Sequence, residues 1–349
     1  MFKRRTIARL MAAASLTPTP ALAQQSVPLS RIAFGSCADQ AKPQPIWEAI
    51  QTYRPELFIF AGDNVYGDFQ TAEAGNLRQA YDAATRIPGY VKLRDTVPHL
   101  AVWDDHDYGS NDGGVEFPHK AVAKEEFLRF WKVPSDDVRR SREGIYTAQT
   151  IGPPGGSVQI ILLDVRWFRS PLKITDQRGA PGKERYLPDP DPAKTMLGDA
   201  QWAWLAAELR KPADLRLIVS GTQLLADGHG WERWGNFPLE RQKMYDIVRA
   251  AGASNVVLLS GDRHIGALYR ETPPGLYPLH EVTSSGINQV YAAAREPGPN
   301  RLGDLLAEAN FGTLDIDWPQ RKLTLALRDM QGEVRRSVDL RFDEMRLPA

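Results

Sequence analysis

Short apolar runs recur along the chain, and each is closed by glycine or by polar residues. Seven such runs cover residues 31–37, 57–68, 99–107, 158–169, 215–223, 255–264 and 279–286. Runs of four to six apolar residues that end in glycine or aspartate are typical of strands buried on both faces. We therefore expect a sheet structure made largely of buried strands.

Helical spacing fills some of the intervals. Apolar residues fall on one helical stripe in residues 46–53, 197–209 and 239–252. The last of these segments stops at Gly252, a suitable residue for a helix end. Beyond residue 310 apolar residues alternate with polar ones, as in amphipathic strands, over residues 312–318, 322–328 and 334–342. Buried strands alternating with helices, then an antiparallel strand group, predict a layered α/β fold with helices outside.

The first 23 residues differ from the rest of the chain. A basic start that includes Arg4 and Arg5 precedes a short apolar core, and small residues precede Gln24. This pattern predicts an export signal and a periplasmic or secreted protein, whereas the alternative is a disordered basic tail. The paired arginines allow the twin-arginine export machinery as the route. Residues 24–349 contain no linker-like stretch, so we expect them to form one domain.

Composition excludes some classes of partner. Lysine plus arginine and aspartate plus glutamate each number 43, which gives no indication of a nucleic-acid or anionic-membrane partner. No segment after the signal offers eighteen uninterrupted apolar residues, so no transmembrane segment is expected. The single cysteine, Cys37, rules out an internal disulfide and by itself suggests a buried, inert thiol.

Reactive side chains follow the predicted strands, where ligands gather in open α/β sheets. These side chains are Cys37, Asp63, Tyr66, Asp105, His106, Asp107, Asn111, Asp262 and His264. Thiolate and imidazole suit transition metals, whereas oxygen-rich ligands suit hard cations, so this mixed set predicts at least two metal ions. Two neighbouring cations can clamp the attacking and leaving oxygens of a phosphoryl transfer.

The segment after residue 103 concentrates charge. Asp105 and Asp107 are two residues apart, so on an extended segment they face one way while His106 faces the other. A turn at 108–109 could then fold the two carboxylates around a metal. His106 is left to contact phosphate or to act as a general acid, and Asp104 is expected to be a structural partner.

Three other candidates have open alternatives. Arg166 can offer a fork of donors to phosphate oxygens, or it can form a salt bridge with Asp164 or another neighbour. Asn111 is a candidate metal ligand or a turn former. His229 lies in the tryptophan-rich segment 228–238, which can form part of a substrate pocket or a packing cluster.

Seven ordered motifs resemble those of the alkaline phosphatase D (PhoD-like) family, within the calcineurin-like metallophosphoesterase superfamily. They read FGSC, GDNVYGD, WDDHDYGSND, LDVRWFR, LGDAQWAWL, SGDRH and TSSG. The resemblance covers residues 31–290 and implies a four-layer αββα sandwich of two mixed β-sheets flanked by helices. It also implies hydrolysis of small phosphate mono- or diesters by in-line attack of a metal-activated water. The implied metals are iron (Fe³⁺) and calcium or another divalent ion.

The resemblance also implies roles for the first ligand set. Cys37 takes the place of a histidine in the wider superfamily, Asp63 bridges two metals, and Tyr66 binds iron. One departure from the superfamily is that Gly35 stands where its first motif has an aspartate. Another is that no residue of this chain is identified as the usual mid-chain histidine ligand.

The later motifs complete the implied set. Asp105 and His106 occupy the superfamily's asparagine–histidine positions, and Asp262 with His264 matches its last two-ligand motif. A close alternative activity is phospholipase D-like hydrolysis of lipid head groups. A remoter alternative is a non-catalytic binding protein stabilised by calcium, although calcium prefers oxygen ligands to a thiol or an imidazole.

Overall fold

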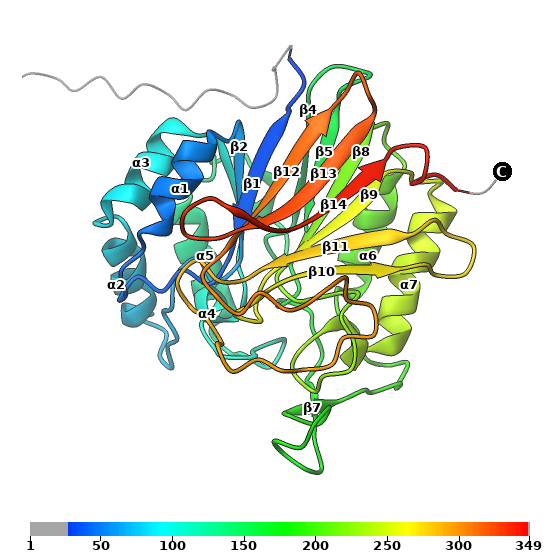
Figure 1. Ribbon diagram of the computed structural model, residues 1–349. Coiled ribbons are helices and arrows are strands. Elements are labelled where there is room, and N and C mark those ends of the chain that lie inside the picture. Colours follow the sequence, from blue (N-terminus) through cyan, green and yellow to red (C-terminus); the bar gives the residue numbers. More distant parts are fainter. Residues whose placement is uncertain (1–26, 348–349) are drawn as a thin grey trace, which may run out of the picture.

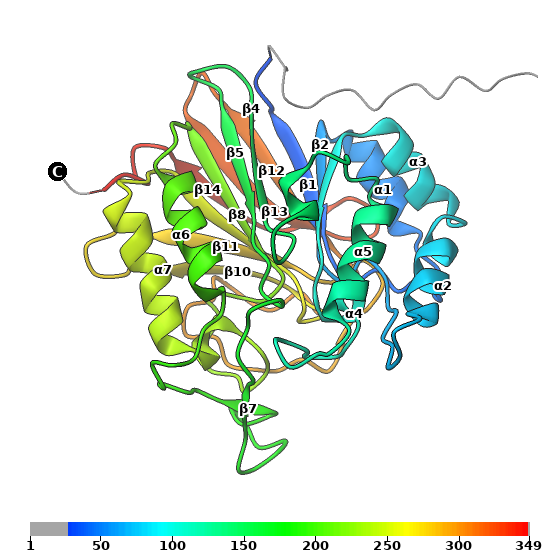
Figure 2. The same ribbon diagram turned by 180° about the vertical axis from the view of Figure 1, so that it is seen from behind.

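The computed structural model describes residues 27–347, which form two β-sheets packed face to face between layers of helices (Figures 1 and 2). The predicted export signal, residues 1–23, lies outside the described residues. Among the described residues, no helix combines the length and the apolar character needed to span a membrane.

The first sheet has the strand order β14-β13-β12-β1-β2-β3. Its strands are β1 (Arg31–Gly35), β2 (Leu57–Ala61), β3 (His99–Val102), β12 (Phe311–Asp317), β13 (Lys322–Arg328) and β14 (Val334–Arg341). Strands β1, β2 and β3 are parallel to one another, whereas β12 pairs antiparallel with β1 and continues into β13 and β14. The C-terminal strand group therefore completes this sheet.

The second sheet has the strand order β10-β11-β9-β8-β5-β4. Its strands are β4 (Thr147–Ile151), β5 (Val158–Leu162), β8 (Leu215–Ser220), β9 (Val256–Ser260), β10 (Gly266–Glu271) and β11 (Leu279–Ser284). Strands β5, β8, β9 and β11 are parallel, and the two edge strands are antiparallel. A small separate hairpin joins β6 (Lys173–Ile174) and β7 (Tyr186–Leu187).

Helices cover the outer face of each sheet (Figure 1). The first sheet is covered by α1 (Ile46–Tyr53), α2 (Gly75–Ala84), α3 (Pro88–Thr96) and α5 (Lys120–Phe130), and the second by α6 (Gly198–Leu209) and α7 (Pro238–Ala250). The remaining short elements are α4 (Asp105–Tyr108) and the 3₁₀ turns η2 (Val138–Arg140) and η3 (Trp234–Asn236). The expected four-layer arrangement is confirmed.

The hydrophobic pattern explains this architecture. Every residue of β2, β5, β8, β9 and β11 is buried, as expected for strands covered on both faces. The three predicted helices lie where their apolar stripes indicated, and Gly252 follows the last of them with a positive φ of 66°. Because the parallel strands of both sheets end at one edge, the loops that follow them meet there.

Candidate metal centre

Several residues at this edge have an unusual backbone conformation. The φ angle is 62° at Cys37, 47° at Asp63, 68° at Asp262, 56° at His264 and 51° at Asp112. Non-glycine residues with positive φ cost about 1–3 kcal/mol each and persist where the surrounding structure holds them. These five are half of the ten such residues in the described part of the chain, so strained backbone concentrates in the loops at this edge.

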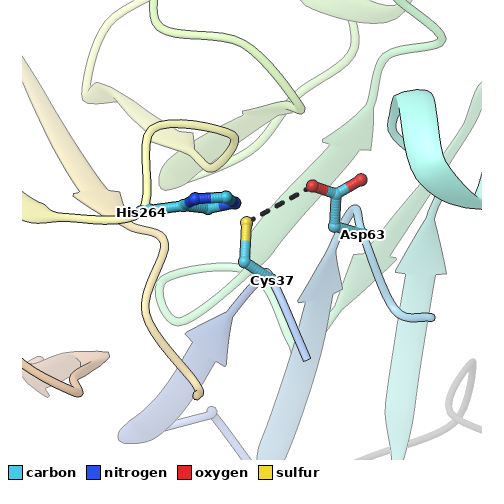
Figure 3. A group of neighbouring side chains, drawn as sticks. All are labelled: Cys37, Asp63 and His264. Atoms are coloured by element: carbon cyan, nitrogen blue, oxygen red, sulfur yellow. Dashed lines mark hydrogen bonds between the residues drawn. The ribbon is translucent and has the colours of Figure 1, made fainter. Parts of the chain in front are cut away.

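Cys37, Asp63 and His264 bring three kinds of ligand atom together (Figure 3). The sulfur of Cys37 lies 3.4 Å from Oδ2 of Asp63, and one ligand atom from each residue lies within 4.8 Å of the others. The Tyr66 hydroxyl lies 3.4 Å from the same Asp63 oxygen and 3.0 Å from Nε2 of His264. A thiol, a carboxyl, a phenol and an imidazole therefore surround one point.

Ser285 holds two of these groups in place. Its hydroxyl lies 3.0 Å from the sulfur of Cys37 and accepts a 2.7 Å hydrogen bond from the backbone N–H of His264. Ser285 follows directly after β11, within the motif TSSG. Sequence reasoning singled out that motif but gave the serine no role.

Two groups of carboxylates adjoin the thiol. Asp63, Asp105 and His106 form one compact group, and Asp104, Asp105 and Asp262 form another, each with ligand atoms within 4.8 Å of one another. Asp63 is shared with the thiol group and also accepts a 3.1 Å hydrogen bond from the backbone N–H of His106. Oδ1 of Asp105 is buried and has no hydrogen-bond partner among the described residues.

The electrostatics of these groups fit bound cations. Burial and the neighbouring carboxylates raise the pKa of Asp63 and of Asp262 well above the usual range. Burial also opposes ionisation of Asp105, but the charges of His106 and Arg166 outweigh it and lower the pKa of Asp105. An orphaned carboxylate oxygen among acids that resist ionisation indicates a site that lacks positive charge. The residues present therefore fit a metal centre.

The thiol and phenol fit the same conclusion. Burial raises the pKa of the Cys37 thiol to about 11, and burial likewise raises the pKa of Tyr66. A neighbouring cation stabilises the anionic forms of such groups, which are the forms that bind metal. Without a cation, both groups stay neutral near pH 7.

The segment after Asp104 is helical rather than extended. Residues 105–108 form the single turn α4, which ends at Gly109 with φ 111°. Asp107 points away from the candidate ligands: it accepts a 2.6 Å bond from the backbone N–H of Asp104 and a 2.5 Å bond from the Asn64 amide. The expectation that Asp105 and Asp107 fold around one metal is therefore wrong, because Asp107 caps the helix instead.

His106 is held by a carboxylate that the sequence did not indicate. Its Nδ1 lies 2.7 Å from Oδ2 of Asp68, and its ring lies 4.2 Å from that of Tyr66. Burial disfavours the charged imidazolium, but Asp105, Asp63 and Asp68 outweigh it and raise the pKa of His106 to about 11. Asp68 is the last residue of the motif GDNVYGD.

A cavity of about 280 Å³ opens beside these residues. The candidate ligands on its wall are Asp63, Asp105, Asn111, Asp262 and His264, next to His106. Trp231 and Glu232, from the segment 228–238 that was expected to form part of a pocket or a packing cluster, also line it. Residues that sequence reasoning did not assign to a site complete the wall, namely Asp112, Arg185, Arg263, Val290 and Tyr291. A larger cavity of about 640 Å³ lies beside α2 and includes Tyr66 and Asp68 in its wall.

Arg166 and His229 do not line this cavity. Arg166 is fully buried, and its guanidinium lies 2.6 Å from Asp104 and 2.7 Å from Glu232. His229 is also buried, with Nε2 3.1 Å from the side-chain oxygen of Gln223. The substrate contacts predicted for both residues are therefore corrected: burial keeps them behind the wall, and Arg166 forms the salt-bridge alternative with Asp104 and Glu232.

Sequence comparison finds one family model and one curated relative that match this chain. A profile of the PhoD-like phosphatase family matches residues 32–296. The alkaline phosphatase D of Bacillus subtilis (strain 168) is 22% identical over 283 residues, which cover 68% of this chain and 46% of that protein. The chain thus spans about half the length of that relative.

Two solved structures share the fold of this chain. A solved structure of PhoD matches with a TM-score of 0.70 and 16% identity, covering 94% of this chain and 72% of that one. A purple acid phosphatase from yellow lupin (Lupinus luteus) seeds matches with a TM-score of 0.61 and 11% identity, covering 93% and 56%. Both likenesses agree with the layered fold described above.

Proposed function

We propose that this chain, which belongs to the PhoD-like phosphatase family, is a metal-dependent phosphoesterase that hydrolyses small phosphate mono- or diesters. The observation that carries the proposal is the convergence of metal-ligand side chains from both sheets on one cavity, beside His106. A binding protein that holds only calcium would have little use for the thiol of Cys37 or the imidazole of His264.

The donor types suggest how two kinds of metal would be shared. Cys37, Tyr66 and His264, together with Asp63, suit iron. Asp63, Asp105 and Asp262, with the amide of Asn111 nearby on the cavity wall, suit calcium or another divalent cation. When bound, such ions supply a Lewis acid for a phosphoryl oxygen and an activated water as nucleophile.

The protein's own residues bind the ester and handle the proton. In the reaction the P–O bond to the alcohol breaks, a water oxygen bonds to phosphorus, and the leaving oxygen takes up a proton. His106 is the candidate donor of that proton, because it lines the cavity and Asp68 engages Nδ1, leaving Nε2 available to a ligand. Arg185 and Arg263 line the same cavity and are the candidate contacts for phosphate oxygens.

Hydrolysis of 4-nitrophenyl phosphate and bis(4-nitrophenyl) phosphate by the metal-replete protein tests the proposal. His106→Asn should lower kcat by about 10²–10⁴-fold for an alkyl phosphate and by less for 4-nitrophenyl phosphate, whose leaving group needs no proton. His119→Asn is a matched control, because His119 lies outside the cavity and contacts the backbone oxygen of Gln70. If metal-replete protein hydrolysed none of these esters, the proposal would be overturned.

The proposed metals have a separate test. Elemental analysis of natively purified protein should find iron together with calcium or another divalent metal. A tyrosinate ligand to Fe³⁺ should give a visible absorption band that Tyr66→Phe removes. Tyr186→Phe is the control, because its hydroxyl binds Asp112 rather than the thiol group. A protein without iron, or a band that survives Tyr66→Phe, contradicts this assignment.

The proposed site of action is the periplasm or the exterior of the cell. The support is the signal-like composition of residues 1–23. A reporter fused to these residues should be exported. Replacement of Arg4 and Arg5 by lysine should block export only if the twin-arginine machinery carries the protein.

A further inference from the structure

We propose that part of the cavity wall binds a flat aromatic ring carried by the alcohol portion of the ester. This inference rests on the proposed function and adds a substrate class, small phosphate esters with an aryl or heteroaryl group. The ring-binding part, called here the aromatic wall, consists of Trp231, Tyr291, Arg185 and Arg263, all of which line the cavity.

The two rings of the aromatic wall present surface to the cavity. Their centroids lie 6.1 Å apart with an interplanar angle of 76°, an edge-to-face arrangement. Tyr291 is 39% exposed, which is unusual for a large aromatic side chain, and Trp231 is half-buried. Two aromatic surfaces set nearly at right angles can contact the face and the edge of a third ring. Both rings therefore keep surface that a ligand in the cavity can contact.

Hydrogen bonds from the backbone N–H groups of Tyr291 and Trp231 order the aromatic wall, and the first of them reaches a candidate metal ligand. The N–H of Tyr291 donates to the carbonyl of His264 over 2.8 Å, so its position follows that of a candidate ligand. The N–H of Trp231 donates to Nδ1 of His229 over 3.2 Å. The next residue, Glu232, is buried and bound to Arg166. A wall that is already ordered loses little entropy when a ligand binds.

The two arginines hold the indole and add polar donors. The guanidinium carbons of Arg263 and Arg185 lie 4.8 and 5.2 Å from the Trp231 ring centroid. Glu296 binds the Arg263 guanidinium at 2.8 Å, and Asp112 binds that of Arg185 at 2.6 Å. Nε of Arg263 is buried and makes no hydrogen bond within the described part of the chain. The wall therefore combines aromatic surface with two guanidinium groups that line the cavity, which suits a ring attached to a phosphate.

The cavity is large enough for the proposed ester. A cavity of about 150 Å³ is enough to hold benzene. The volume here is about 280 Å³, which is enough for one ring and a phosphate group. The geometry thus points to small esters with a single ring near the phosphate.

A matched pair of substrates tests this inference. 2-Phenylethyl phosphate and 2-cyclohexylethyl phosphate have chains of equal length and leaving alcohols of similar acidity, so they differ mainly in the flatness of the ring. We expect metal-replete wild-type protein to favour the phenyl ester in kcat/KM by about 3–10-fold, the range of one aromatic contact. In Trp231→Leu and in Tyr291→Leu the preference should fall toward one.

Trp204→Leu provides the matched control. Trp204 also pairs with a tyrosine, Tyr146, at 4.7 Å, and Arg142 lies 5.4 Å from its ring, but the pair lies outside the cavity. This variant should keep the wild-type preference. A wild-type ratio near one, or a ratio that both wall variants preserve, would overturn the inference.

Failure of the proposed function would look different. In that case neither these esters nor 4-nitrophenyl phosphate would be hydrolysed. Calorimetric binding of 2-phenylethylphosphonate and its cyclohexyl analogue to wild-type protein then decides the role of the wall. Tighter binding of the phenyl compound that is lost in Tyr291→Leu supports the wall, and equal binding refutes it.

Discussion

Two groups of buried acids lie side by side at the strand ends, and only one of them is neutralised by arginine. Asp104 and Glu232 form the neutralised group: Arg166 lies 2.6 and 2.7 Å from them, and Arg169 lies 3.1 Å from Glu232. The cavity acids Asp63, Asp105 and Asp262 form the other group, and within residues 27–347 none of them forms a salt bridge with lysine or arginine.

This difference suggests that the paired acids stabilise the fold, whereas the unpaired acids are available to bind metal. Asp104 lies just after β3 of the first sheet, and Arg166 lies just after β5 of the second. Their ion pair therefore connects the two sheets next to the cavity. The cavity acids carry similar charge without a resident guanidinium, so neutralising them requires a bound cation or a proton. Within the described residues, no lysine or arginine pairs directly with these three acids, although Arg185 and Arg263 line the same cavity.

The largest expected effect comes from a cavity acid. Asp63→Asn removes the carboxylate shared by two candidate groups, so we expect loss of metal and a fall in kcat of about 10³-fold or more. Asp164→Asn is the control: Asp164 is buried but binds the Trp103 indole and backbone N–H groups instead of the candidate ligands. Elemental analysis and kinetics check the prediction. If both variants lost metal equally, the cavity acids would not differ from other buried acids in binding metal.

The neutralised group should respond through stability. Arg166→Met leaves Asp104 and Glu232 buried without their shared cation, which should lower the free energy of unfolding by about 3–5 kcal/mol. Arg185→Met removes a partly exposed partner of Asp112 and should cost about 1 kcal/mol or less. Urea denaturation measures both. If both variants lost a similar free energy of unfolding, burial of the arginine would not determine how much its ion pair stabilises the protein.

The convergence of the site was predictable, because strand ends can be located from the apolar pattern. Cys37, Asp63 and Asp262 each follow a short buried strand, and parallel strands that end at one edge bring such residues together. The same logic placed His264 and Asp105. The fold class and the main strands were predictable for the same reason.

Some residues that loops bring to the site were not predictable. Asp68 meets His106 only because residues 105–108 form a helical turn, and local alternation gave no sign of that turn. Arg185 reaches the cavity from the β6–β7 hairpin, whose path no periodicity encodes. Arg166 was misjudged because an arginine after a strand can serve an internal acid as well as a ligand, and only packing distinguishes the two.

The pH dependence of stability should differ between metal-free and metal-loaded protein. In metal-free protein the raised pKa values of Asp63 and Asp262 mean that the folded state retains protons that the unfolded state has released. His106, with its pKa raised to about 11, acts in the same direction above its unfolded pKa. Stability should therefore fall between pH 7 and pH 9, by about 1.4 kcal/mol per pH unit for each proton that only the folded state retains.

Metal binding should oppose this fall, because metals require deprotonated ligands and bind more tightly as pH rises. Urea denaturation of metal-loaded protein should thus show stability that is level or rising over the same range. A parallel decline in both forms would mean that the cavity acids do not hold the metals.

The smallest expected effect lies at the boundary between the groups. Asp112 lies near Glu232 and Asp262, but Arg185 at 2.6 Å and the Tyr186 hydroxyl at 2.8 Å already satisfy it. Because that ion pair is partly exposed, Asp112→Asn should change the free energy of unfolding by about 1 kcal/mol or less and leave metal content intact. Denaturation and elemental analysis test this. If this variant lost one equivalent of metal, Asp112 would have to be counted with the cavity acids. An ion pair with arginine would then not distinguish the acids that bind metal from those that do not.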